Sequence, residues 1–392
     1  MEIVKERMLA HVETVANIQP IPNCDNIEYV TVLGWNVIQR KDSVKVGDKV
    51  VYIEIDSKVP SDNPCFAFLE SRKYKVKSIK MRGVISQGLI MTFTDLGLDE
   101  SKFNVGDDVT EILGITKIDT EEEQRLKAEE DALNIARNSH AKFFNNPLVK
   151  KLMQYKWFRK LVLPKKPKES KGFPDFIHKT DETRVENMPW VLNDCEKVWL
   201  QTEKIDGTSS TYAIRMLGKK KHEFIVCSRN VRQAHKMTAS DLKKDPNKYW
   251  EIAIRYNIEK VLVELQRNTF PQYPVVILQG EIIGEGIQGN PYKLKGTDFY
   301  GYNLIFCNPK TGEYNRCSSE TGKATLETYN MNWVPILGTT TLPSTMTEMK
   351  EQAEGDSQIT KGVKREGIVY RSLDGQESFK NVSNSYLLKH NG

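Results

Sequence analysis

The sequence lacks a run of apolar residues long enough to cross a membrane, and it lacks closely spaced cysteines. A transmembrane helix needs about 20 consecutive apolar residues, and the opening segment MEIVKERMLA is charged where a secretory signal would be apolar. The six cysteines are dispersed without a CxxC pair, which argues against a zinc knuckle or a disulfide framework. These absences predict a soluble, cytoplasmic protein with reduced cysteines and no membrane partner.

Histidine is also scarce, with six residues scattered along the chain, so neither a His-based metal site nor a Ser/His/Asp triad has local support. The net charge of +5 is a mild excess that suits a polyanionic partner without requiring one. At 392 residues, with 39% hydrophobic and 28% charged residues, the chain is typical of a globular protein with two or three domains.

Residues 1–115 read as short strands separated by Gly and Asp turns, which predicts an OB-type β-barrel. This architecture commonly binds oligonucleotides on one face. Within the segment SRKYKVKSIKMRG, strand alternation would place Lys73, Lys75 and Lys77 on one face. We interpret them as RNA-binding candidates that follow a phosphate backbone, with a solvated edge strand as an equally supported alternative.

Residues 116–170 differ in composition from the first segment. Helix formers dominate TEEEQRLKAEEDALNIARNSHAKFF, and LVKKLMQYKWFRKLVL has the pattern of a basic amphipathic helix. Such a helix could lie on a nucleic acid or a membrane surface, but a connector helix packed on a domain is the favoured interpretation. The Pro- and Lys-rich stretch PKKPKESKGFP predicts a linker.

From residue 171 to residue 392 the pattern is rich in strands with intervening helices, including a helix over roughly 246–267. This predicts an α+β domain built on antiparallel sheets. The segment TEKIDGTSSTY within it has the pattern of a hairpin, but it also carries Lys204 two residues before an Asp-Gly turn. A single lysine in such a place is usually a surface charge. The motifs that follow it along the chain must therefore show whether Lys204 is a surface residue or a nucleophile.

Further motifs follow in order after Lys204-Ile-Asp-Gly: Ser-Arg229-Asn, Glu281 in LQGEIIGEGIQG, DFYGYNL at 298–304, Glu366-Gly-Ile-Val-Tyr-Arg, and Ser-Phe-Lys380. This ordered series resembles the motifs of the covalent nucleotidyltransferase superfamily, which contains ATP-dependent DNA ligases, RNA ligases and mRNA capping enzymes. The layout is most similar to RNA ligases of the Deinococcus and Naegleria type, which place an OB domain before the nucleotidyltransferase domain. The phrases GDKVVYIEID, RGVISQGLIM and FPDFIHKTDETRVEN carry the closer resemblance.

The resemblance implies that Lys204 attacks the α-phosphate of ATP and forms a lysyl-AMP adduct. An amine with a reference pKa near 10.4 must lose its proton before it can attack. The resemblance also gives roles to Asp206, Glu281 and Glu366, three carboxylates that could hold Mg²⁺ or Mn²⁺ through water. Such hard cations keep several waters and engage few carboxylates directly. Turn and edge positions are the structural alternative for these three residues.

Several basic residues are candidates for phosphate contacts by the same resemblance. Arg229 would contact AMP or the 5′ end of the RNA, Lys380 would neutralise charge on the phosphates, and Arg184 is a further candidate. The fifth motif of many relatives carries Lys-x-Lys, whereas Lys380 here is followed by Asn-Val. Lys389, expected on the next strand, is our candidate for the missing second lysine.

An aromatic residue should stack on adenine, and Phe299, Tyr300 and Tyr302 are the candidates on one expected strand. Tyr300 and Tyr302 would share a face, with Phe299 on the other, and core packing is the alternative for any two of them. Glu203 matches a family position beside the adenine base. We also include Gly207 among the nucleotide-binding candidates, because glycine permits close backbone approach.

The resemblance implies an ATP-dependent RNA ligase that acts as a monomer at nicks or breaks in RNA, with a nicked duplex or an RNA/DNA hybrid as candidate substrates. Alternatives within the superfamily are a DNA ligase and a capping guanylyltransferase. An alternative from another class is a non-catalytic nucleic-acid-binding protein that fuses an OB module to a degenerate nucleotidyltransferase fold. A covalent nucleotide adduct on Lys204 distinguishes this last alternative from the others.

Overall fold

The computed structural model describes residues 7–118, 147–152, 155, 171–218, 221–233, 236–373, 375 and 377–390. By its internal contacts the chain divides into one unit formed by Met1–Ile115 with Ser170–Gly392 and a second formed by Thr116–Glu169. The second unit contains β10 (Thr116–Lys117) and α4 (Pro147–Leu152). Most of the expected connector, including much of the basic amphipathic segment, lies outside the described residues.

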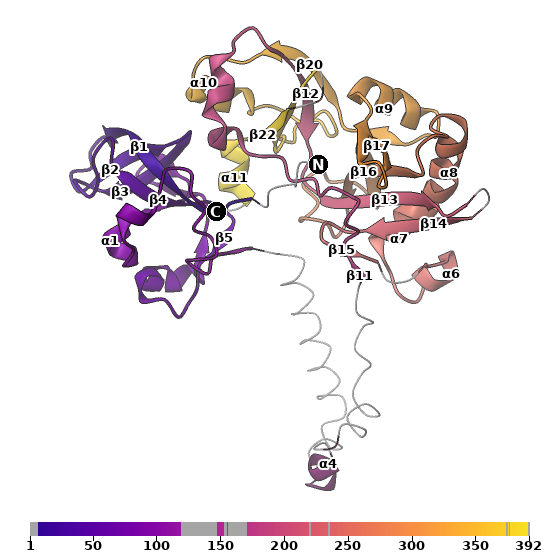
Figure 1. The fold of residues 1–392 in the computed structure, drawn as a ribbon, viewed down its shortest axis with the longest axis horizontal. Helices are drawn as coiled ribbons and strands as arrows, with labels where there is room; N and C mark the ends of the chain where they lie inside the picture. The colour runs from indigo at the N-terminus through magenta and orange to yellow at the C-terminus, as the bar shows by residue number, and fades with distance from the viewer. Residues whose placement is uncertain are drawn as a thin grey trace. The chain divides into compact units, whose positions relative to one another are not determined.

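The N-terminal part of the first unit is an OB domain, as the sequence predicted. Its five-stranded sheet has the order β3-β2-β1-β4-β9, with all neighbours antiparallel (Figure 1). The strands are β1 (Ala10–Pro20), β2 (Ile27–Val32), β3 (Trp35–Arg40), β4 (Lys49–Ile53) and β9 (Leu89–Met91). Shorter elements complete the domain: β5 (Ser57–Lys58), η1 (Pro64–Arg72), β6 (Lys75–Val76), β7 (Ile79–Met81), β8 (Val84–Ser86), α1 (Phe93–Leu96) and η2 (Glu100–Lys102). Alternating buried positions along β2 and β3 turn one face of this sheet into the barrel core.

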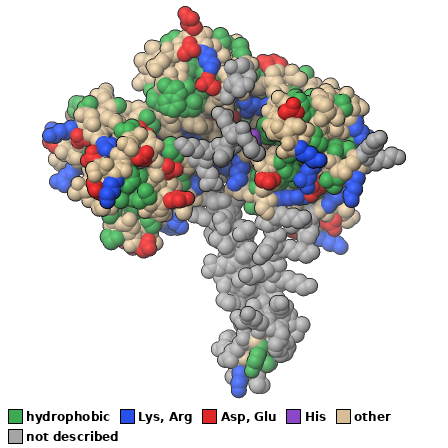
Figure 2. All heavy atoms as spheres, viewed as in Figure 1, with side chains coloured by type: hydrophobic (Ala, Val, Ile, Leu, Met, Phe, Trp, Pro, Cys, Tyr) green, Lys and Arg blue, Asp and Glu red, His purple; other side chains and the backbone are tan. Residues whose placement is uncertain are grey.

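The expected continuous strand carrying three aligned lysines is wrong. Lys73 caps η1 in a left-handed conformation, and only Lys75 lies in a strand, β6, which is two residues long. Because Lys73 and Lys77 fall outside β6, strand alternation does not align the three side chains. On the face drawn in Figure 2, basic and acidic side chains are interspersed over the OB domain and form no stripe of one sign.

The larger sheet of the C-terminal domain has the order β11-β15-β14-β13-β16-β17-β18, and β19 pairs with β17 in parallel. Its strands are β11 (Lys171–Gly172), β13 (Thr208–Met216), β14 (His222–Cys227), β15 (Val231–Arg232), β16 (Val275–Gly284), β17 (Thr297–Asn308), β18 (Glu313–Arg316) and β19 (Asn332–Trp333). All its other pairings are antiparallel, as expected. The central strands β13 and β16 are buried along most of their length, so they form the buried centre of this sheet.

A second, four-stranded antiparallel sheet has the order β20-β12-β21-β22. Its strands are β12 (Val198–Lys204), β20 (Ile336–Thr341), β21 (Gly367–Ser372) and β22 (Ser378–Val382). The chain passes from this sheet to the larger one in the short turn between β12 and β13. Residues near this turn can therefore meet residues from both sheets.

The helices of the C-terminal domain are short. They are η3 (Val185–Asn187), η4 (Pro189–Asn193), α6 (Ala239–Leu242), α7 (Lys248–Arg255), α8 (Ile258–Asn268), α9 (Ser319–Glu327), α10 (Met346–Gln352) and α11 (Asn384–His390). The expected single helix over 246–267 is two helices, because Asn257 adopts a left-handed conformation between α7 and α8. Residues of these two helices pack with β13, β14 and β16 in the largest hydrophobic core. Among the described residues, no helix is long and apolar enough to span a membrane.

Candidate nucleotide-binding site

Lys204 is the last residue of β12, and strand pairing brings it to Glu366. The register of β12 with β21 places Lys204 opposite Gly367, so Glu366 precedes the partner residue. The Nζ atom of Lys204 lies 2.5 Å from Oε2 of Glu366. An added Cβ at Gly367 would lie 2.2 Å from the carbonyl oxygen of Asn381, so only glycine allows β22 to approach β21 this closely here. The two sequence motifs therefore meet through backbone pairing.

The acidic surroundings keep Lys204 protonated in this arrangement. Burial of the ammonium group opposes its charge, but Glu366, followed by Glu281 and Asp206, raises the pKa of Lys204 above its ordinary value. A lysine must be neutral to attack a phosphorus atom. Offsetting the charge of these carboxylates would therefore favour the reactive form of Lys204.

We refer to Asp206, Glu281 and Glu366 as the carboxylate cluster. Asp206 lies in the turn after β12, where its backbone N–H donates to the Tyr292 hydroxyl at 2.8 Å and its Oδ2 accepts from the Tyr386 hydroxyl at 2.7 Å. Burial and the charge of Glu366 raise the pKa of Asp206 to about 6. Burial also raises the pKa of Glu281 to about 8, against the effect of Lys204 and with a contribution from the other two carboxylates.

Burial first, and then the like charges of the carboxylate cluster, raise the pKa values of Asp206 and Glu281 in spite of the neighbouring Lys204. This donor set fits a hard divalent cation, which prefers oxygen ligands. Within the part of the chain that the structure describes, however, no three His, Cys, Asp or Glu residues come together closely enough to hold a metal ion directly. The arrangement is thus suited to a cation that keeps its own water shell.

Gly207 is required by packing against β16. An added Cβ would lie 2.4 Å from the Ile282 carbonyl oxygen and 2.9 Å from Cγ of Glu281. Since the first of these contacts is with backbone, neither side could move away easily. The close approach permitted by this glycine therefore positions Glu281, one residue of the carboxylate cluster, next to the turn that carries Asp206.

We refer to Arg184, Arg229 and Lys380 as the cation cluster. Asp181 joins two of its members: Oδ1 accepts from Nζ of Lys380 at 2.9 Å, and Oδ2 lies 3.3 Å from Nη2 of Arg229. Arg184 forms a backbone bridge with Lys380, whose N–H donates to the Thr183 carbonyl oxygen at 2.8 Å. The segment from Asp181 to Arg184 thus runs beside β22 and gathers the three basic residues.

The cation cluster is the electrostatic counterpart of the carboxylate cluster. Burial lowers the pKa of Lys380 to about 8, Asp181 opposes this shift, and the positive charges of Arg184, Arg7 and Lys204 add to it. The Lys380 side chain is only 13% exposed. A phosphate group bound here would meet two positive groups, Lys380 and Arg184, that are already largely desolvated.

The aromatic candidates occupy three different environments on β17. Phe299 is fully buried and packs edge-on against Tyr212, with ring centroids 5.6 Å apart, so it belongs to the core. The Tyr302 hydroxyl lies 2.9 Å from both Ser209 Oγ and Thr180 Oγ1. Tyr300 is half-buried, and burial together with the charges of Asp298 and Glu203 raises its pKa.

Glu203 is buried beside the nucleophile candidate. Its Oε2 accepts a hydrogen bond from the backbone N–H of Gln358 at 2.8 Å, while Oε1 has no partner among the described residues. Burial raises the pKa of this carboxyl group. A buried acceptor without a partner is costly, so Oε1 is suited to a hydrogen-bond donor from a ligand.

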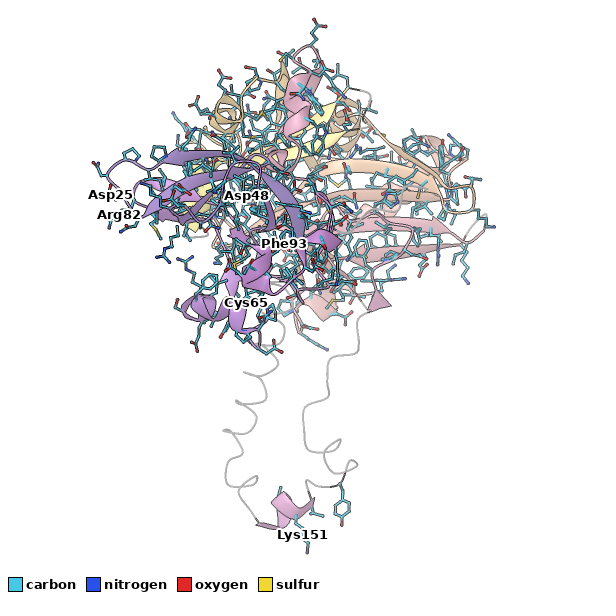
Figure 3. The ribbon with its side chains drawn as sticks, turned by 60° about the vertical axis from the view of Figure 1, so that its left-hand side comes forward. Asp25, Asp48, Cys65, Arg82, Phe93 and Lys151 are labelled. Carbon is cyan, nitrogen blue, oxygen red and sulfur yellow. The ribbon has the colours of Figure 1, made fainter. Side chains whose placement is uncertain are left out.

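Two groups of predicted residues are not brought to these clusters. Lys389 lies on the helix α11 and is exposed, so its expected position on a strand is wrong. It is Tyr386 of the same helix that reaches Asp206. Lys73, Lys75 and Lys77 belong to the OB domain, where they lie outside the hollow lined in part by Asp48, Lys49, Phe93 and Glu100. Asp48 and Phe93 are labelled in Figure 3.

Sequence reasoning missed three residues that shape the site. Tyr292 and Tyr386 hydrogen-bond to the turn residue Asp206 from positions 86 and 180 residues away, and local patterns carry no signal for such contacts. Asp181 stands three residues before Arg184 in the KTDETR stretch, so the stretch itself was recognised. The basic residues held by Asp181 come from distant motifs, and only the fold reveals them.

Both domains of the chain resemble known proteins. One family model, OB-fold domain, matches residues 9–93, and another, RNA ligase, matches residues 197–389. The chain is 31% identical to Naegleria gruberi RNA ligase in a lysine-to-alanine variant with ATP and Mn, covering 98% of this chain and 99% of that chain with a TM-score of 0.72. The chain belongs to the RNA ligase family. A comparison with curated proteins found no match.

Two further structures of the Naegleria enzyme give the same result for this ligase. An aspartate-to-alanine variant without ligand is 32% identical, with 98% of each chain covered and a TM-score of 0.73. A complex with PPi is 31% identical, with 98% of this chain and 99% of that chain covered and a TM-score of 0.72. The similarity spans both the OB domain and the C-terminal domain, so this ligase is an enzyme that resembles its relative over nearly its whole length.

Proposed function

We propose that this RNA ligase is ATP-dependent and seals RNA through a covalent AMP adduct on Lys204. The observation that carries the proposal is the convergence of Lys204 with the carboxylate cluster, beside a separate cation cluster. The structures of the Naegleria relative with ATP and Mn, and with AMP and Mn, support this choice of nucleotide and metal.

The substituted residues of the relative give additional support. Its variants include a lysine and an aspartate two positions apart, as Lys204 and Asp206 are. They also include a glutamate and a lysine fourteen positions apart, as Glu366 and Lys380 are. We therefore propose that the carboxylate cluster and Lys380 belong to the catalytic site of this chain.

The reaction we propose proceeds in three steps. In the first, Nζ of Lys204 forms a bond to the α-phosphorus of ATP, and the bond to pyrophosphate breaks. In the second, a 5′-phosphate oxygen of RNA displaces the lysine and takes the AMP group. In the third, a 3′-hydroxyl oxygen attacks that 5′-phosphorus, a phosphodiester forms and AMP leaves.

The residues of the chain supply binding and charge in these steps. Lys380, Arg184 and Arg229 would bind phosphate oxygens, where fixed positive groups stabilise the charge that develops in phosphoryl transfer. Asp206, Glu281 and Glu366 would hold Mg²⁺ or Mn²⁺ through water. A divalent ion there supplies positive charge that offsets the carboxylates and stabilises the transferring phosphate.

The adenine base would lie beside Glu203 and Tyr300. The unpaired Oε1 of Glu203 can accept a hydrogen bond from the exocyclic amino group of adenine. The charge of Glu203 contributes to the raised pKa of Tyr300, so the two side chains are near each other. Tyr300 is half-buried, which leaves part of the residue accessible to a base. We propose Tyr300 as the stacking residue, in preference to the core residue Phe299 and to Tyr302, whose hydroxyl bonds to Thr180 and Ser209.

Labelling with ATP tests the covalent step directly. Incubation with α-labelled ATP and Mn²⁺ or Mg²⁺, followed by a denaturing gel, should show label on the wild-type chain and none on Lys204→Ala. Lys364→Ala is a matched control, because Lys364 is 63% exposed and pairs with Asp356 on the surface. Absence of label on the wild type, or equal label on Lys204→Ala, would contradict the proposal.

Joining assays test the finer parts of the proposal. We propose a nick in duplex RNA or in an RNA/DNA hybrid as the substrate, and a monomer as the active form. Sealing nicked duplexes that carry RNA or DNA at the 3′-hydroxyl side should favour RNA, and α-labelled GTP should give no adduct. Equal sealing of DNA would support a DNA ligase, a GTP adduct would support a capping enzyme, and light scattering would show whether one chain is present.

A further inference from the structure

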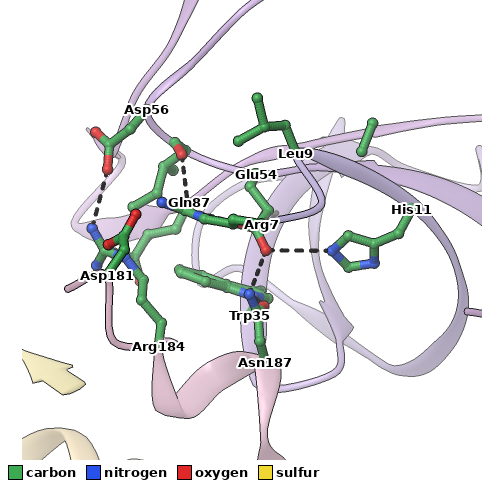
Figure 4. Close-up of polar contacts among 12 residues, drawn as sticks. Arg7, Leu9, His11, Trp35, Glu54, Asp56, Gln87, Asp181, Arg184 and Asn187 are labelled. Carbon is green, nitrogen blue, oxygen red and sulfur yellow. Dashed lines mark hydrogen bonds and ion pairs between the residues drawn. The ribbon is translucent and has the colours of Figure 1, made fainter. Parts of the chain in front are cut away.

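The OB domain contacts the nucleotide-binding site at the basic residue Arg184. The guanidinium group of Arg184 lies 5.7 Å from the ring centroid of Trp35, at the start of β3. Its Nη2 atom lies 3.3 Å from Oδ2 of Asp56, in the turn between β4 and β5. Figure 4 shows this pair together with the neighbouring contacts of the OB domain. A phosphate-binding candidate is therefore held by residues of another domain.

Arg184 still has hydrogen-bonding capacity to offer. The residue is 6% exposed, and its Nε and Nη1 atoms have no hydrogen-bond partner among the described residues. Guanidinium presents its donors in a rigid planar fork, so fixing one nitrogen also fixes the direction of the others. Buried donors without a partner are costly, and an anion would satisfy them.

The remaining donors of Arg184 belong to the same site as Lys380. The two residues form a backbone bridge, and the charge of Arg184 contributes to the lowered pKa of Lys380. The charge of Lys380 also reaches Asp56: burial raises the pKa of Asp56, but Arg184, Arg7 and Lys380 together hold it below its ordinary value. Asp56 is therefore an anion placed at the edge of the cation cluster.

The backbone of the OB domain holds Asp56 in a tight turn. Asp56 has a φ of 66°, a left-handed conformation that aspartate and asparagine tolerate better than most residues. Its backbone N–H donates to the Val76 carbonyl oxygen at 2.9 Å, which anchors the turn to the rest of the OB domain. The Asp56 side chain is 42% exposed, so its place is maintained by the turn and by the arginine.

We propose that Asp56 of the OB domain is a positioning residue for lysine adenylylation, holding Arg184 by one nitrogen so that its other donors face the phosphates of ATP. The inference rests on the proposed function. It gives the OB domain a part in the first chemical step, in addition to any contact with RNA. The carboxylate does not touch the reacting atoms and acts through Arg184.

Two substitutions at Asp56 separate its charge, its hydrogen bond and its backbone. Asp56→Gly removes the side chain and still permits the left-handed conformation. Asp56→Asn preserves that conformation and an oxygen that can accept from Nη2, but it removes the charge. We expect kcat/KM for ATP in adenylylation to fall about tenfold in Asp56→Gly and about threefold in Asp56→Asn, because a charged hydrogen bond is roughly twice as strong as a neutral one.

Asn187→Ala is the matched control for weakened contact between the domains. The Asn187 side chain bonds to Trp35 and to Glu54 of the OB domain. Its backbone N–H donates to the Arg184 carbonyl oxygen at 3.0 Å, a bond that an alanine keeps. We expect this variant to melt at a lower temperature while its KM for ATP stays unchanged. Asp56→Gly should show the opposite pattern, with a raised KM and a melting temperature near that of the wild type.

The outcomes distinguish the inference from the proposed function. If the wild type takes no label from ATP, the proposed function fails and the inference fails with it. If the wild type is labelled and Asp56→Gly matches it in kcat/KM for ATP, the function stands and the inference is wrong. If Asn187→Ala and Asp56→Gly lose adenylylation equally, domain contact alone explains the effect, and the positioning role is also wrong.

Discussion

The carboxylate cluster and the cation cluster each bring together side chains of like charge, negative in the first and positive in the second. In the first, several carboxylates surround Lys204, and the pKa values of Asp206 and Glu281 are raised. In the second, several basic groups surround Asp181, and the pKa of Lys380 is lowered. Each cluster therefore holds an excess of one charge: the carboxylates outnumber Lys204, and the basic groups outnumber Asp181 and Asp56.

The two clusters differ in how the fold assembles them. The carboxylates lie on or beside β12, β16 and β21, strands whose register is set by backbone pairing. The basic residues come from less regular places: Arg184 precedes η3, Arg229 follows β14, and only Lys380 lies within a strand. Side-chain contacts from Asp181 and Asp56 fix this second group. The cation cluster therefore depends more on neighbours outside the sheets.

The largest effect should come from breaking the carboxylate cluster. Asp206→Asn keeps the hydrogen bond from Tyr386 but removes a negative charge, so we expect adenylylation to slow by about 100-fold or more, as when a fixed charge contact in a site is lost. Folding stability should stay equal or rise, because one of several buried like charges is removed. The label-transfer rate and the thermal unfolding midpoint measure the two effects.

Asp356→Asn is the control for that prediction, since the Asp356 side chain is 63% exposed and forms a surface ion pair with Lys364. It should leave both quantities unchanged. A wild-type rate for Asp206→Asn would show that charge at this position is unimportant. A large fall in its melting temperature would show that Asp206 stabilises the fold rather than the reaction.

Breaking the cation cluster should have the next largest effect. Lys380→Ala removes a desolvated positive group, and we expect a loss of about 100-fold in adenylylation, with a smaller loss in Lys380→Arg, which keeps the charge. Single-turnover label transfer measures both variants against Lys364→Ala. If Lys380→Arg were as slow as Lys380→Ala, shape at this position would matter more than charge.

The sequence motifs contain the members of both clusters, but strand pairing makes the positions of the carboxylates easier to predict than those of the basic residues. Lys204, Asp206, Glu281 and Glu366 sit in motifs at strand ends or within strands, where pairing makes the spatial outcome regular. Lys389 was misplaced because a short terminal segment has little periodicity to separate a helix from a strand.

In the OB domain, too, short segments were harder to predict than the overall architecture. Its overall architecture followed from short strands and turns, but the expected lysine face required one long strand, and the chain instead forms η1 and a two-residue strand. Asp56 carried no local signal, because its importance comes from Arg184, 128 residues away. Contacts over such separations arise from domain packing, which a linear pattern does not encode.

The pH dependence of adenylylation tests whether the cation cluster needs the charge of Lys380. The groups facing Lys380 are Asp181, Arg184, Arg7 and Lys204, and together with burial they leave its pKa at about 8, below its ordinary value. Lys380 is therefore charged below this pH and loses its charge above it. We expect kcat/KM for ATP to decline above about pH 8, since this parameter reports groups of the free enzyme.

Asp181→Asn provides the matched test of that decline. Asp181 raises the pKa of Lys380, so its neutralisation should move the alkaline decline to lower pH. Lys380→Arg should remove the decline, because arginine stays charged over this range. An unchanged profile in both variants would assign the decline to another group.

The smallest effect is expected from a change at Gly34, where the OB domain contacts η3, the helix that follows Arg184 of the cation cluster. The Gly34 N–H donates to the Glu186 carbonyl oxygen at 2.8 Å, and an added Cβ would lie 2.8 Å from Cα of Glu186. Gly34→Ala should therefore lower the free energy of unfolding by about 1–3 kcal/mol, as overpacking usually does. Gly218→Ala, with no atom within 4 Å of the added Cβ, should be neutral by comparison in thermal or denaturant unfolding. Overpacking at Gly34 would displace the backbone of η3, which directly follows Arg184, whereas Asn187→Ala removes side-chain contacts only. Gly34→Ala should therefore also raise KM for ATP slightly. An unchanged KM in a variant that unfolds more easily would show that the position of Arg184 does not depend on the backbone of η3.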